Sequence, residues 1–199
     1  LIGASVIVGL PLPILPAQIL WENLIEGGPQ GIALAFEPKE KDVMEREPEH
    51  PKSPLLTRQM KIIIFGFGIV TDFVLLGLFL WLFKKNFSME EIRTIIFAAL
   101  AIDTLFYAFS CKNLRKNIWQ YNPFSNKYLV ASIAFSLMML FAAIYLPFLQ
   151  DLLKTQPLNA HGWILLSGLG MINLILIEAI KRYFIIKVRR DKNHNNKAK

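Results

Sequence analysis

Four polar side chains stand inside long apolar stretches, and they are the residues of this chain best suited to chemistry. Glu22, Asn23 and Glu26 share one apolar stretch, and Asp103 lies in another. Carboxylate and amide oxygens coordinate cations, and a carboxylate can also carry a proton. Because an ionisable group is costly in an apolar interior, it is usually kept there for a function. We therefore predict a cation or proton site that includes Asn23, Glu26 and Asp103.

Each of these residues also has a structural interpretation. Asn23 and Glu26 could form a buried polar pair that holds helices together. Asp103 could be the polar partner of a neighbouring helix. Glu22, beside an aromatic residue, could equally face a water-filled path.

A further acidic residue in an apolar stretch is expected to be structural. Glu178 has Lys181 and Arg182 three and four positions later, which is the spacing of an ion pair on a helix. We expect this pair to lie at the membrane interface.

Several other kinds of site are excluded. The single cysteine, Cys111, excludes a disulfide framework, and the three histidines lack the helical spacing of a zinc site. The sequence contains no glycine-rich phosphate loop and no nucleophile elbow. We expect no catalytic residue and no cofactor in this chain.

The apolar stretches themselves define the class of protein. Hydrophobic residues make up 54% of the chain and charged residues only 19%, against about 25% charged in soluble domains. Runs of about 20 apolar residues match the ~30 Å hydrocarbon core of a bilayer when they are helical. Four such runs, each with at most one ionisable residue, occur at 62–83, 94–111, 128–149 and 163–180. The sequence therefore predicts an all-α, polytopic transmembrane helical bundle.

We divide the chain into segments of one membrane domain. The expected helices are the end of a truncated transmembrane helix (1–10), an interrupted one (14–36) and four complete ones (61–83, 92–111, 128–150 and 162–185). The expected cytoplasmic segments are two loops (37–60 and 112–127) and a basic tail (186–199). The interruption is predicted at Gly27-Gly28-Pro29, because these residues propagate a helix poorly. We expect the helix to unwind there and to form part of an ion path.

Basic residues set the predicted orientation. The regions 37–61, 112–127 and 181–199 carry six, four and eight Lys and Arg residues, whereas 151–162 carries only one. The positive-inside rule places the three basic regions in the cytoplasm, although the three basic residues of 84–93 fit that rule less well. We assign the net charge of +7 to lipid anchoring and not to nucleic-acid binding.

One segment carries a distinctive run of residues. The chain reads LP at 10–11, PAQILWENLI at 16–25, ALAFEP at 33–38 and DVM at 42–44. This run resembles the C-terminal membrane region of P-type cation-transporting ATPases, in particular the calcium-pump-like branch, which reads LP, PxQLLWxNLVTDGLPA, ALGFEPP and DIM. The match is ungapped over these 35 positions.

The resemblance implies an architecture and partners. Residues 1–10 would end the fifth of ten transmembrane helices, and helices six to ten would follow. The D-K-T-G motif and the other catalytic motifs of the family are absent from this chain. The resemblance therefore implies upstream catalytic domains that bind ATP and Mg. This chain would be the ion-translocating part of the pump, in contact with the lipid bilayer and the transported cation or proton, and located in the cell membrane.

The resemblance also implies site residues. Asn23 matches an asparagine ligand of the sixth helix, Glu26 stands where the family has threonine, and Gly27 stands where it has aspartate. In the eighth helix, either Asp103 or Thr104 matches a family ligand position, depending on a shift of one residue. The transported ion therefore stays open between a proton, a monovalent cation and a single divalent cation.

Two other functions remain as alternatives. The first is a non-catalytic membrane scaffold or passive channel derived from the same fold. The second is a secondary transporter, which predicts an inverted repeat. We find no such repeat in the sequence.

Overall fold

The computed structural model describes residues 1–39, 44, 54, 58–113 and 116–197, so most of the predicted loop 37–60 lies outside the described residues. Every regular element in this part of the chain is a helix. The α-helices are α1 (Ile2–Ile7), α2 (Pro16–Trp21), α3 (Gly28–Leu34), α4 (Arg58–Lys61), α5 (Gly68–Lys84), α6 (Met89–Cys111), α7 (Lys127–Tyr145), α8 (Pro147–Leu153) and α9 (Ala160–Lys197). Two π-helical segments, η1 (Glu22–Gly27) and η3 (Ile62–Phe67), and the 3₁₀ turn η4 (Ile118–Gln120) join them.

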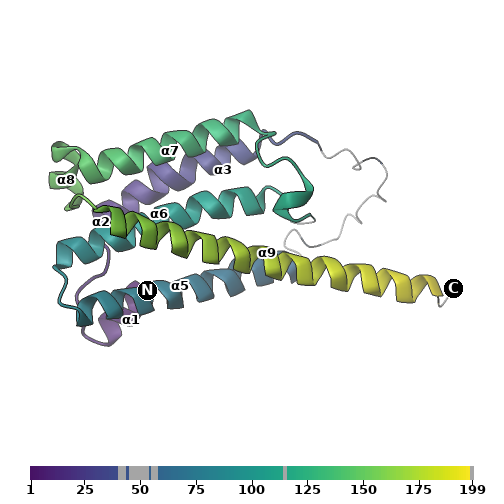
Figure 1. The fold of residues 1–199 in the computed structure, drawn as a ribbon. Coiled ribbons are helices and arrows are strands. Elements are labelled where there is room, and N and C mark those ends of the chain that lie inside the picture. Colours follow the sequence, from purple (N-terminus) through teal and green to yellow (C-terminus); the bar gives the residue numbers. More distant parts are fainter. Residues whose placement is uncertain (40–43, 45–53, 55–57, 114–115, 198–199) are drawn as a thin grey trace.

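Among the described residues, four helices are long and apolar enough to cross a membrane: Ile64–Lys84, Met89–Cys111, Lys127–Tyr145 and Ala160–Tyr183. Figure 1 shows them as an elongated bundle, with α9 continuing past the other helices towards the C-terminus. The predicted all-α transmembrane bundle is thereby confirmed.

Helix α6 forms the centre of the bundle. Its residues Ile92, Ile96, Phe97 and Ala101 have no exposed surface. Helix α9 crosses α6 closely at Gly170, where an added Cβ would lie 2.6 Å from the Phe106 ring. A small residue is therefore needed where these two helices meet.

The predicted helix 128–150 is two helices in the structure. Helix α7 ends at Tyr145 and α8 begins at Pro147, with extended backbone at Leu146 (φ −85°, ψ 123°). A proline disfavours helical backbone in the residue before it and has no N–H to donate, so the helix breaks here. Apolar content alone did not reveal this break.

Two other helix ends also differ from the predicted ones. Helix α6 starts at Met89, not at 92, because Ser88 caps it and Glu91 bonds back to Ser88, as in a capping box. Helix α9 continues to Lys197, beyond the predicted end at 185. Its extension contains neither glycine nor proline, so no residue type stops it.

The predicted interruption of 14–36 takes a different form. Helices α2, η1 and α3 follow one another without a gap, so the chain is not unwound at Gly27-Gly28-Pro29. The turn is widened instead, and the Gly28 N–H bonds to the carbonyl of Asn23, five residues back. Pro29 cannot donate to the Ile25 carbonyl, and the Ser136 hydroxyl of α7 donates to that carbonyl at 3.2 Å.

The two ends of the bundle gather different loops. At one end, the Gln156 N–H donates to Thr94 Oγ1 (2.9 Å), which joins the loop after α8 to the start of α6. At the other end, Asn126 and Lys112 contact the Glu37 carboxylate at 3.0 and 3.4 Å. The loop after α8 and the basic loop 112–127 thus lie at opposite ends of the bundle, as the positive-inside rule predicts. Which end faces the cytoplasm stays a prediction.

Candidate cation site

Glu26 occupies the buried side of η1. Its side chain has no exposed surface, and no donor in the described part of the chain lies within hydrogen-bond distance of either carboxylate oxygen. The helix packs against α6 and α7 at this level. A buried acceptor without a partner is rare and costly, so Glu26 is a candidate site residue.

Glu22 lies one turn before Glu26 on the same π-helical segment. One of its oxygens accepts a hydrogen bond from Thr104 Oγ1 at 3.3 Å, and the other is buried without a partner among the described residues. Glu22 thus lies between Glu26 on its own segment and Thr104 on α6.

Asp103 and Thr104 point to different neighbours. Asp103 Oδ1 accepts a hydrogen bond from Asn173 Nδ2 of α9 at 2.7 Å, whereas Thr104 turns to Glu22. Both residues line a small, open cavity of about 260 Å³ beside Tyr107. The choice between Asp103 and Thr104 as the family ligand stays open, because each has a polar role here.

Asn23 has a different environment from Glu26. Its side chain is exposed in this chain, and its amide donates to the Ile19 carbonyl of its own helix at 2.9 Å. The structure therefore brings Thr104 to Glu22, one turn before the buried Glu26, and leaves Asn23 exposed on the same segment.

A signal for Glu22 was present in the sequence. Glu22, Glu26 and Gln30 follow one another at intervals of four, and residues four apart share one face of a helix. In the structure each of the three has a buried oxygen without a partner among the described residues. Three polar residues on one face of an apolar helix indicate a functional site more strongly than any one of them does.

Protein ligands for a metal are sparse in the described residues. No three His, Cys, Asp or Glu side chains there come close enough together to hold a metal ion. The described carboxylates could thus contribute part of a coordination shell, together with hydroxyl and carbonyl oxygens.

The expected pair of Glu178 and Lys181 forms, but in the interior. The two side chains lie 2.8 Å apart with exposed fractions of 3% and 0%. Arg182 is exposed. The carboxylate also accepts hydrogen bonds from Asn117 Nδ2 and the Ile118 N–H, at 2.8 and 2.9 Å. The pair is therefore a buried clamp between α9 and the loop after α6, and its place at the membrane interface stays a prediction.

Tyr121 closes this clamp from the loop. Its hydroxyl donates to the Phe109 carbonyl at 2.7 Å. Burial, together with the nearby charge of Glu178, raises the pKa of the Tyr121 phenol above its usual range. Tyr121 thus stays a neutral hydrogen-bond donor.

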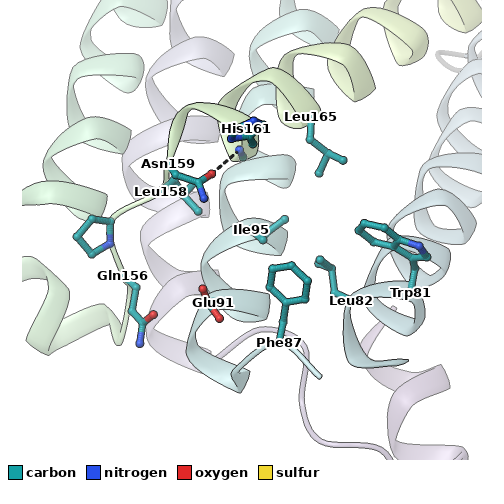
Figure 2. Close-up of a pocket in the computed structure, with 12 residues that line it drawn as sticks. Trp81, Leu82, Phe87, Glu91, Ile95, Gln156, Leu158, Asn159, His161 and Leu165 are labelled. Atoms are coloured by element: carbon teal, nitrogen blue, oxygen red, sulfur yellow. Dashed lines mark hydrogen bonds between the residues drawn. The ribbon is translucent and has the colours of Figure 1, made fainter. Parts of the chain in front are cut away.

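A second cavity lies at the opposite end of the bundle (Figure 2). It measures about 190 Å³ and is lined mainly by apolar side chains between the end of α5 and the starts of α6 and α9. Figure 2 shows Trp81 and Phe87 on one side of it and Leu165 on another. Its Glu91 carboxylate is already engaged with the Ser88 cap. The cavity contains none of the predicted site residues.

Comparison with known proteins identifies relatives over most of the chain. The family "Cation transporting ATPase, C-terminus" matches residues 11–183. A "Calcium-transporting ATPase" of Bacillus subtilis is 32% identical over 176 residues, which cover 87% of this chain and 19% of that protein.

Two further relatives cover similar shares. The "Calcium-transporting ATPase type 2C member 2" of Rattus norvegicus is 33% identical over 186 residues, 91% of this chain and 19% of its own length. A "Probable cation-transporting ATPase F" of Mycobacterium bovis is 32% identical over 163 residues, 81% of this chain and 18% of its own length. The chain thus spans about a fifth of these relatives.

Four apolar helices and a family match over 11–183 lead to one conclusion. The chain is an integral, multi-pass membrane segment and belongs to the cation-transporting ATPases, as their C-terminal membrane region.

Proposed function

We propose that this chain is the ion-translocating C-terminal membrane domain of an ATP-driven cation pump and supplies part of the intramembrane cation site. The observation that supports this most directly is Glu26, a wholly buried carboxylate with no partner among the described residues. Such a group is available to a cation that arrives from outside the segment.

Glu26 would exchange a proton for the cation. A carboxylate without a donor or counter-charge is disfavoured in its charged form in an apolar interior. Glu26 would therefore hold a proton while the site is empty and release it when a cation binds. This exchange gives countertransport of protons with no additional group.

The energy source is also part of the proposal. ATP and Mg would be bound by upstream catalytic domains of the same polypeptide, as the resemblance implies, in the cell membrane. Two of the relatives are named calcium-transporting ATPases, and a third a probable cation-transporting ATPase. For this chain the transported species is proposed only as a cation.

The test is an ion screen of ATP hydrolysis by the complete pump. We expect a particular cation to stimulate hydrolysis, and Glu26→Gln to abolish that stimulation while membrane insertion stays normal. Glu90→Gln is the matched control, because Glu90 is exposed at the end of the bundle, outside this site.

Normal pumping with unchanged ion affinity in Glu26→Gln would refute the role of Glu26 and make Asp103 the leading candidate. Cation flux that needs no ATP would instead support the passive channel.

A further inference from the structure

We propose that Glu22 is a second carboxylate ligand of the cation site, positioned by the hydroxyl of Thr104. This inference rests on the proposed function, since it adds a residue to the same site. Three observations carry it: the burial of its free oxygen, the anchoring of the other oxygen, and its place one turn before Glu26 on the same segment.

The two carboxylate oxygens of Glu22 have different environments. Oε1 is held by Thr104 Oγ1 at 3.3 Å, whereas Oε2 is buried and has no partner among the described residues. The Thr104 hydroxyl also lies 3.0 Å from the Leu100 carbonyl of its own helix, so its single proton is shared between these two acceptors. One oxygen is thus oriented by the protein and the other is left to bind a ligand, as is usual for carboxylates that hold metals.

The helix carries both carboxylates to the same side. Glu22 and Glu26 are four residues apart on one π-helical segment, and residues at this spacing lie on one face. Such π-helical segments are frequently found at functional sites.

Charge gives the reason for a second carboxylate. With Glu26 alone, the segment offers one negative charge. Glu22 supplies a second charge from the preceding turn. Two like charges in an apolar interior repel each other, and a bound cation or a proton relieves that repulsion.

The experiment compares cation affinity in the complete pump, purified in detergent. The stimulation of ATP hydrolysis is titrated separately with Ca²⁺, Mn²⁺ and K⁺ in the parent protein and in Glu22→Gln, Glu22→Asp, Thr104→Val and Glu90→Gln. The same proteins are checked for a monodisperse elution profile and for their unfolding temperature.

We expect Glu22→Gln to raise the half-saturating concentration of the stimulating cation at least tenfold, the scale found when a site loses a ligand-orienting group. Glu22→Asp keeps the charge and should weaken affinity less. Thr104→Val should weaken it by about tenfold, the lower end of the range for loss of a ligand-positioning partner. Glu90→Gln should leave affinity unchanged.

Selectivity separates a ligand from a structural residue. Loss of one negative charge should weaken Ca²⁺ and Mn²⁺ more than K⁺, whereas a merely destabilised protein would lose all three responses together.

Two failures can be told apart. An unchanged affinity in Glu22→Gln, with the response lost in Glu26→Gln, would overturn this inference and leave the proposed function standing. The absence of any cation response in the parent protein would overturn the proposed function and this inference with it.

Discussion

Two buried glutamates of this chain differ in what surrounds them. Glu178 contacts an ammonium group, an amide and a backbone N–H, whereas Glu26 contacts no donor in the described structure. The first is therefore satisfied within the chain, whereas the second has no partner among the described residues. Burial alone does not distinguish a structural carboxylate from one available to a ligand.

Loss of the Glu178 clamp should lower the stability of the protein measurably. Glu178→Gln would leave the Lys181 ammonium buried without its counter-charge, and we expect a loss of about 3–5 kcal/mol in the free energy of unfolding. The double variant Glu178→Gln with Lys181→Met removes both charges and should regain most of that loss. Thermal unfolding in detergent measures both effects. Equal stability of Glu178→Gln and the parent would show that Lys181 does not depend on this partner.

Part of the Glu178 clamp could be predicted from the sequence. Lys181 could be paired with Glu178 from spacing alone, since both lie on one helix. Ser110 and Asn117, which complete the clamp, come from 68 and 61 positions earlier, and no local pattern joins them to it. Glu22 stayed undecided for the same reason, because Thr104 is 82 positions away.

At the scale of the elements, apolar length predicted the existence of the helices better than their ends. A bilayer imposes a length on each span, so the four complete spans were recognisable. Their ends depend on single residues such as Ser88 and Pro147, whose effect is local and independent of hydropathy. The predicted unwinding at Gly27-Gly28-Pro29 was wrong, because the helix continues through a widened turn and Ser136 on another helix bonds to the carbonyl of Ile25.

The crossing of α6 and α9 offers a matched pair of variants. Gly170→Ala would place a Cβ 2.6 Å from Phe106 and 2.8 Å from Ile102, so we expect overpacking to cost about 1–3 kcal/mol. Gly168→Ala, two positions earlier on α9, meets nothing within 4 Å and should be neutral or stabilising by up to about 1 kcal/mol. Unfolding temperatures of the two proteins give the comparison. A Gly170→Ala protein as stable as Gly168→Ala would show that α9 can shift away from α6.

At the scale of the whole molecule, the two ends of the bundle predict accessibility from opposite sides of the membrane. Phe124 is 63% exposed at one end, and His161 is exposed at the other. In a Cys111→Ser background of the complete pump, Phe124→Cys should resist an impermeant thiol reagent on intact cells, and His161→Cys should react. Thr155 is a poor position for such a label, because it is buried. The opposite labelling pattern would invert the predicted orientation.

The length of α9 determines how far the end of this helix extends beyond its apolar, membrane-spanning part. At 1.5 Å per residue, the 14 residues after Tyr183 extend the helix by about 21 Å. Attraction to anionic lipid fades over a Debye length of about 8 Å at physiological ionic strength. When the helix axis follows the bilayer normal, the end of α9 lies farther from Tyr183 than the lipid charge reaches, so its backbone stands clear of the membrane surface.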